Sequence, residues 1–144
     1  MIIGQYSSKL TEGNRISIPK KYRDELGEEI IIAKWYEGSL ILVSKQYWKD
    51  LIERLTGKSR IIAGPVRDID RFIYGSAFEL EFDGQGRFVL PEMLKEYAKI
   101  NSEVVFAGLG DRVEIWASER WLELEKTAEG KSSDAIEEIA KGEK

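Results

Sequence analysis

The stretches "EGNRISIPKKYR" at residues 12–23 and "DGQGRFVLPEML" at residues 83–94 carry the same pattern. Each has a turn containing glycine, then an arginine, three mostly apolar residues and a proline. Arg15 and Arg87 are separated by 72 positions, and so are Pro19 and Pro91. The same turn pattern therefore occurs twice in the chain at a fixed spacing, which indicates an internal repeat.

Local signals around the first stretch predict a hairpin followed by a short helix. Gly13 and Asn14 tolerate a positive φ at little cost, so they predict a tight turn. Residues 15–18 alternate between polar and apolar side chains, as in a half-buried strand. Pro19 ends that strand and suits the first turn of a helix, which Gly27 then closes.

The elements around the two stretches follow the same order in both halves. Each half predicts strand, strand, short helix, strand, strand. The predicted ranges are 5–10, 15–18, 20–26, 29–35 and 39–43 in the first half, and 78–82, 87–90, 91–98, 103–108 and 112–116 in the second. Each unit is too small to bury its apolar face alone, so the two copies are expected to cover each other. The predicted fold class is α+β with a pseudo-twofold repeat.

Helices are predicted after each repeat. Ser44 can cap a helix with one apolar face, Pro65 suits the start of a connecting helix, and Ser118 can cap a third. The tail from Gly130 is polar and is expected to be partly helical or frayed. The predicted organisation is a first repeat at 5–47, connecting helices at 48–75, a second repeat at 76–119, and a C-terminal helix with a polar tail at 120–144.

Composition excludes several kinds of protein. A chain of 144 residues is long enough for one domain with a real core. The absence of cysteine excludes disulfides and thiolate metal sites, and with no histidine a structural zinc site is not expected. The commonest general base is also missing. No apolar run approaches the ~20 residues that span a bilayer, and the start lacks a signal-peptide pattern, so we expect a cytoplasmic protein.

Charge is distributed unevenly along the chain. The net charge is −4, which by itself argues against nucleic acid. Residues 9–23 nevertheless carry five basic side chains and one acidic, whereas residues 72–116 carry four basic and eight acidic. Such a chain can offer one basic face despite its acidic total. Charge alone leaves an ordinary solvated surface as the simpler interpretation.

The two stretches closely resemble the repeats of the MraZ family. "DGQGRFVLPEML" followed by "AKINSEVVFAGLGDRVEIW" is similar to the second half of those proteins, and "EGNRISIPKKYR" with "SLILVSKQYW" to the first. Both halves look like the SpoVT-AbrB DNA-binding unit, and the resemblance runs from about Gly4 to Trp121. It implies a swapped-hairpin, double-split β-barrel with flanking helices. It also implies a transcriptional regulator of the division and cell-wall gene cluster that assembles as a ring-shaped homo-oligomer.

The family carries an Asp-x-x-x-Arg motif in each half. Asp83 and Arg87 match it in the second half. In the first half Arg15 matches, but Thr11 stands where the family has Asp, and Asn14 replaces the usual glycine before the arginine.

These residues predict a DNA-binding surface in the first half. Arg15 can contact guanine or phosphate with two hydrogen bonds, and Asn14 can pair with adenine. The DNA-contacting set is completed by Lys9, Lys20, Lys21 and Arg87. The alternative for Arg15 is an ion pair with a neighbouring carboxylate such as Glu12. For Arg87 the favoured interpretation is a structural turn pair with Asp83, with DNA contact as the alternative.

The sequence therefore predicts a sequence-specific regulator that binds double-stranded DNA. It is expected to act as a repressor, as an oligomer on repeated DNA boxes, in association with the nucleoid. The alternative is an antitoxin-type DNA-binding protein of the same fold class that neutralises a partner protein. We expect no enzyme activity, cofactor, metal, membrane contact or small-molecule substrate.

Overall fold

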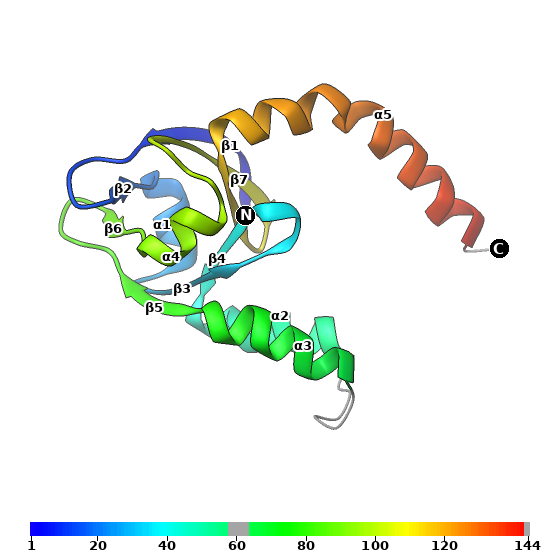
Figure 1. The fold of residues 1–144 in the computed structure, drawn as a ribbon, viewed down its shortest axis with the longest axis horizontal. Coiled ribbons are helices and arrows are strands. Elements are labelled where there is room, and N and C mark those ends of the chain that lie inside the picture. The colour runs from blue at the N-terminus through cyan, green and yellow to red at the C-terminus, as the bar shows by residue number, and fades with distance from the viewer. Residues whose placement is uncertain (58–63, 143–144) are drawn as a thin grey trace.

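A computed structural model describes residues 1–57 and 64–142 (Figure 1). Its first half holds β1 (Ile2–Lys9), β2 (Arg15–Ser17), α1 (Lys20–Leu26), β3 (Glu29–Lys34), a 3₁₀ turn (Tyr36–Gly38), β4 (Leu40–Ser44) and α2 (Lys45–Thr56). The predicted strand at 5–10 begins earlier, at Ile2. Ser44 caps α2 as predicted, since its hydroxyl accepts a hydrogen bond from the backbone N–H of Tyr47 at 3.0 Å.

The second half repeats this order after a connecting helix. It holds α3 (Gly64–Ile73), a 3₁₀ turn (Tyr74–Ser76), β5 (Phe78–Glu81), β6 (Arg87–Val89), α4 (Glu92–Tyr97), β7 (Glu103–Gly110), β8 (Val113–Ala117) and α5 (Ser118–Gly142). The tail, expected to be partly helical or frayed, continues α5 as helix to Gly142. The predicted connecting segment 48–75 includes residues 58–63, which lie outside the described residues.

Strand pairing joins the two halves. A six-stranded antiparallel sheet has the order β1-β7-β8-β4-β3-β5, and β2 pairs with β6 in a separate two-stranded sheet. The equivalent strands of the two halves are β1 and β5, β2 and β6, β3 and β7, and β4 and β8. Exchanging the two members of each pair leaves the sheet order unchanged. The pairing of β1 with β7 becomes that of β5 with β3, and the pairings β4–β8 and β2–β6 are each exchanged into themselves. The repeat is therefore a pseudo-twofold arrangement in which each half supplies strands to the other.

Hydrogen bonding among the described strands does not close a barrel. The six-stranded sheet ends at β1 and β5, and the two-stranded sheet lies apart from it. The expected swapped-hairpin, double-split barrel therefore stays a prediction, since the described strands pair in two separate sheets. The α+β class and the repeat hold, because a large antiparallel sheet is flanked by helices in both halves.

The main core lies between the two sheets. It is closed by α1 and α4, which supply Tyr22, Leu26 and Leu94. The two-stranded sheet and the residue after each of its strands contribute four buried side chains, namely Ile16, Ile18, Phe88 and Leu90. Burying each such side chain stabilises the fold by about 1.5–3 kcal/mol, so this core fixes the two-stranded sheet rigidly.

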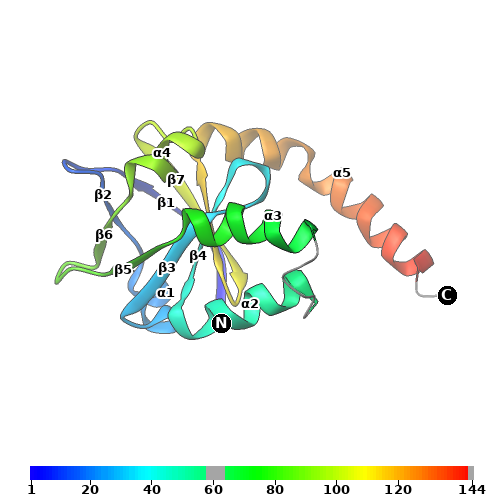
Figure 2. The same cartoon turned by 60° about the horizontal axis from the view of Figure 1, so that its bottom comes forward.

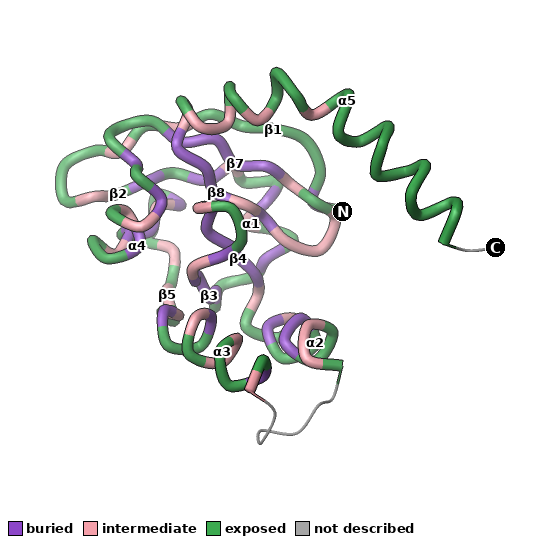
Figure 3. Tube along the Cα trace, turned by 45° about the vertical axis from the view of Figure 1, so that its right-hand side comes forward, coloured by how far each residue is buried: buried purple, intermediate pink, exposed green. Residues whose placement is uncertain are grey.

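The opposite sheet face is covered differently in the two halves. Over the strands of the first half, α2 and α3 bury it with Trp48, Leu51, Ile52 and Ile73. Over those of the second half, α5 touches it near its start, where the rings of Trp116 and Trp121 pack 6.0 Å apart. From Glu129 on, α5 is exposed and projects away from the body (Figure 3). No helix within 1–57 and 64–142 is long and apolar enough to cross a membrane.

Candidate nucleic-acid interface

The two-stranded sheet of β2 and β6, which we call the ribbon, presents one face outward. In its antiparallel register Arg15 lies opposite Val89 and Ser17 lies opposite Arg87. Opposed residues share a face, and neighbours along a strand alternate. The buried side chains of Ile16 and Phe88 point inward, so these four residues form the outward face. The ribbon lies at the end of the molecule opposite the C-terminus (Figure 2).

The turns that lead into β2 and β6 are closed by equivalent backbone hydrogen bonds, and the second has one more, from the N–H of Gly86 to the carbonyl of Asp83 at 3.0 Å. The N–H of Thr11 donates to the carbonyl of Arg15, and that of Asp83 to Arg87, each at 2.8 Å. Across the ribbon the N–H of Leu90 donates to Asn14 at 2.8 Å. In the equivalent bond, the N–H of Ile18 donates to the carbonyl of Gly86 at 3.3 Å. The pseudo-twofold axis therefore passes through the ribbon and relates Arg15 to Arg87.

Both turns need a left-handed residue directly before the arginine. Asn14 has a φ of 58° and Gly86 a φ of 74°. Asparagine is among the few residues other than glycine that adopt this conformation readily. An added Cβ at Gly86 would also require the guanidinium of Arg23 to shift. That guanidinium is held in place by donating to the carbonyl of Ile18 at 2.6 Å.

Arg87 is held by Asp83. One carboxylate oxygen accepts from the backbone N–H groups of Gln85 at 2.9 Å and Arg87 at 3.0 Å. The other accepts from Nε of Arg87 at 2.9 Å. The N–H of Arg87, with that of Gln85 and the guanidinium, lowers the pKa of Asp83 below its usual value. The Arg87 side chain keeps only 29 % of its surface exposed, so it lies along the turn.

Arg15 lacks such a carboxylate. Its Nη1 donates to the backbone carbonyl of Glu12 at 3.2 Å, and in 1–57 and 64–142 no carboxylate lies within ion-pair distance of it. Thr11, at the position of Asp83, instead donates its hydroxyl to the carbonyl of Arg15 at 3.2 Å. An exposed guanidinium with one weak backbone partner retains most of its donors for a ligand.

The base contact expected of Asn14 stays a prediction, and in the structure its side chain makes one exposed hydrogen bond. Its side-chain amide donates to the carboxylate of Glu92 in α4 at 2.8 Å. Reading adenine would require this bond to open. The geometry gives Asn14 a structural part, since it shapes the turn and ties it to α4 across the pseudo-twofold axis.

The three lysines of the predicted set are exposed. Lys9 pairs with Glu103 at 3.4 Å and Lys20 with Asp24 at 3.1 Å, and both side chains remain about three-quarters accessible. Lys21 is exposed beside Lys20. Solvent-exposed ion pairs contribute little, about 0–1 kcal/mol, so these ammonium groups can turn to a phosphate at small cost.

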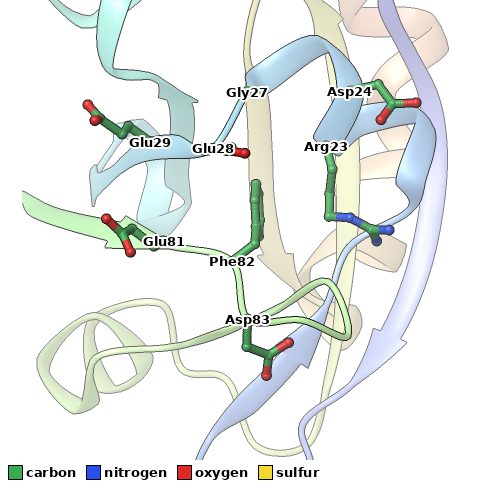
Figure 4. A pocket seen from close by; sticks show the side chains of 8 residues that line it. All are labelled: Arg23, Asp24, Gly27, Glu28, Glu29, Glu81, Phe82 and Asp83. Carbon is green, nitrogen blue, oxygen red and sulfur yellow. The ribbon is translucent and has the colours of Figure 1, made fainter.

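A hollow beside the ribbon does not suit an anion. It has a volume of about 620 Å³ and lies between α1 and the turn before β6 (Figure 4). It is lined by Arg23, Gly27, Phe82 and five carboxylates: Asp24, Glu28, Glu29, Glu81 and Asp83. These carboxylates repel phosphate. No group of acidic side chains in the described residues is arranged to hold a metal ion.

Sequence reasoning did not single out Ser17 and Val89. Both lie on the outward face with the two arginines. The period-two alternation of "RIS" and "RFV" carries the signal, because the residue two positions after each arginine must share its face.

Comparisons with known proteins match both halves. The sequence profile of the family described as "MraZ protein, putative antitoxin-like" matches residues 1–72 and again 73–143. A protein from Leuconostoc mesenteroides is 40% identical over 99% of this chain and 96% of its own length. One from Syntrophomonas wolfei is 36% identical over 96% of both chains, and one from Clostridium acetobutylicum 39% over 89% of both. All three are named "Transcriptional regulator MraZ".

Proposed function

This chain belongs to the MraZ family, and we propose that it regulates transcription by binding double-stranded DNA through the outward face of the ribbon. Relatives similar over nearly the whole chain bear the name of a transcriptional regulator. The chain is accordingly a regulator and not an enzyme.

The observation that carries the DNA-binding surface is the exposed Arg15 on a rigid two-stranded ribbon. The major groove of B-DNA admits a two-stranded β-ribbon, and arginine is the commonest side chain to read guanine there. Arg15 lies on the outward face without a carboxylate partner in the described residues. Lys9, Lys20 and Lys21 would contact phosphates and set the position of the ribbon.

A single ribbon is too small for a specific complex by itself. Specific interfaces bury roughly 1,000–2,500 Å² of protein surface, far more than two three-residue strands provide. We therefore propose a homo-oligomer, arranged as a ring, in which several ribbons bind repeated DNA boxes together. In this proposal the protein represses the division and cell-wall gene cluster and associates with the nucleoid. The two sheets and their exchanged strands would form the swapped-hairpin, double-split barrel.

The proposal is tested by titrating the protein with labelled DNA. The target is the region upstream of its own gene, and a shuffled duplex of equal length is the control. Preferential binding to the target that weakens with salt supports the proposal. Equal binding to both duplexes would contradict specific recognition. Light scattering at micromolar concentration tests the oligomer, and a monomer would contradict the ring.

An antitoxin-type function is the second candidate, and the exposed half of α5 favours it. Leu122, Ile136 and Ile139 are exposed on this helix, and the family description includes the words "antitoxin-like". Co-purification with a partner protein that is lost when residues 130–144 are deleted would support this candidate. Purification without any partner would favour the regulator acting alone.

A further inference from the structure

The outward face of the ribbon breaks the pseudo-twofold symmetry at one pair of positions. Arg15 and Arg87 are equivalent residues, but their cross-strand neighbours are not. Val89 lies opposite Arg15, whereas Ser17 lies opposite Arg87. The strand pairing is therefore symmetric, but the side chain opposite the arginine is polar in one case, Ser17, and apolar in the other, Val89.

Val89 is the exposed exception among the apolar residues of the ribbon. Ile16 and Phe88, the other apolar residues of β2 and β6, are buried in the core. Val89 keeps 48 % of its surface exposed. It faces away from that core beside a guanidinium, so its two methyl groups are presented on the surface that carries Arg15.

The spacing of this pair is between one and two base-pair steps. Directly opposed residues on two strands have Cβ atoms roughly 4.5–5.5 Å apart. Successive bases along one DNA strand are about 3.4 Å apart. With the ribbon in the major groove, the side chain opposite Arg15 would be within reach of a base pair next to the one that Arg15 reads. In the major groove the only apolar group on a base edge is the C5-methyl of thymine.

We infer that Val89 is a specificity-determining residue that contacts the methyl group of a thymine next to the base pair read by Arg15. Ser17, its equivalent, presents a hydroxyl and has no such preference. The two halves of one ribbon thus read unlike bases, and the DNA box is asymmetric although the ribbon is pseudo-twofold. This inference rests on the proposed DNA-binding function.

The test removes the methyl group from the DNA. Sequences that bind the wild-type oligomer are first selected from a random duplex library. Each thymine of the selected box is then replaced singly by deoxyuridine, which lacks only the C5-methyl. A buried methyl group contributes ~0.8 kcal/mol, so one position should lower affinity about fourfold per site. Val89→Ser should abolish this sensitivity, and Ser17→Val should create a second sensitive thymine.

Matched controls separate a base contact from altered folding. Val89→Ile keeps an apolar contact and should retain the sensitivity. Met93→Ser removes an equally exposed apolar side chain from α4 and should leave it unchanged. Circular-dichroism melting curves of all variants should overlay that of the wild type.

Two results would overturn the inference separately from the proposed function. If a box is selected but no thymine responds to deoxyuridine, Val89 does not read a methyl group. The inference also fails if Val89→Ser keeps the wild-type response. If the library yields no enriched sequence at all, the proposed function itself is wrong, and the inference falls with it.

Discussion

The turns before β2 and β6 are closed by the same backbone hydrogen bond and differ in charge. The N–H of Thr11 donates to the carbonyl of Arg15, as that of Asp83 does to the carbonyl of Arg87. Residues 9–23 nevertheless carry five basic side chains and one acidic, whereas the equivalent residues 81–95 carry two basic and three acidic. The two repeats therefore place their arginines at equivalent positions of the ribbon but surround them with different local charge.

The difference extends to how each arginine is held. Asp83 fixes Arg87 with a carboxylate that also accepts two backbone N–H groups. Thr11 has no charge and leaves the guanidinium of Arg15 on a single carbonyl at 3.2 Å. In one turn the arginine stabilises the protein's own loop, and in the other it remains available to a ligand. We therefore propose that DNA recognition rests chiefly on the first turn.

Replacing the two arginines should give the largest effect. Arg15→Ala is expected to abolish specific DNA binding, because a lost bidentate base contact costs about 1–3 kcal/mol per site and an oligomer loses several at once. Arg87→Ala should weaken binding less, since its guanidinium is already engaged by Asp83. Titrations on target and shuffled DNA at two salt concentrations measure both. A larger loss for Arg87→Ala would place recognition in the second turn.

Substitutions at the two positive-φ positions, Gly86 and Asn14, should lower the free energy of unfolding by different amounts. Gly86→Ala forces an alanine into a positive φ and displaces the guanidinium of Arg23 from the carbonyl of Ile18. It should lower the free energy of unfolding by about 2–3 kcal/mol. Asn14→Gly keeps the conformation and loses only an exposed bond to Glu92, so its effect should stay within about 1 kcal/mol. Urea unfolding of the two variants makes the comparison, and equal losses would show that the Arg23 contact is unimportant.

The two lysines at the start of α1 should affect the affinity for DNA without affecting sequence specificity. Lys20→Ala or Lys21→Ala is expected to weaken binding to target and shuffled DNA alike. Each should reduce the slope of log affinity against log salt by about 0.9, the contribution of one phosphate contact. Met93→Ala is the control, because Met93 is the uncharged residue equivalent to Lys21. An unchanged slope would exclude phosphate contact by that lysine.

Acidification should act on the second turn alone, and this effect is the smallest. The pKa of Asp83 is lowered in the folded protein, so its hydrogen bonds are intact above the ordinary Asp range and are lost as the pH falls through the lowered value. The amide resonances of Gln85 and Arg87 should shift over that range. The amides of Gly13 and Arg15 should not follow, since Thr11 does not titrate. Parallel shifts in both turns would indicate a global acid transition instead.

Much of this scaffold is predictable from the sequence because it depends on local signals. The 72-residue spacing predicts the order of the strands in both halves, and the range 20–26 predicted for α1 agrees with the structure. Ser44 caps α2 as its position suggests. Proline, glycine and alternating side chains act within a few residues, so their consequences can be deduced without tertiary information.

Contacts between distant residues could not be predicted in this way. The amide of Asn14 bonds Glu92, which is 78 positions away in the sequence. The base contact expected of Asn14 stays a prediction, and its bond to Glu92 is a contact that only tertiary packing supplies. The ends of the sheet are likewise set by distant contacts, namely the cross-half pairing of β1 with β7 and of β5 with β3. The tail beyond 130, expected to be partly helical or frayed, is helical to Gly142.

We propose that the residue four positions before each arginine decides which arginine reaches DNA. The test exchanges these residues, as Thr11→Asp and Asp83→Thr in separate proteins, and titrates each protein on the selected DNA box. We predict that Thr11→Asp weakens specific binding several-fold, because the new carboxylate draws Arg15 into an ion pair. We predict that Asp83→Thr leaves binding unchanged or strengthens it. Wild-type affinity for Thr11→Asp, with a loss of binding for Asp83→Thr, would contradict the account.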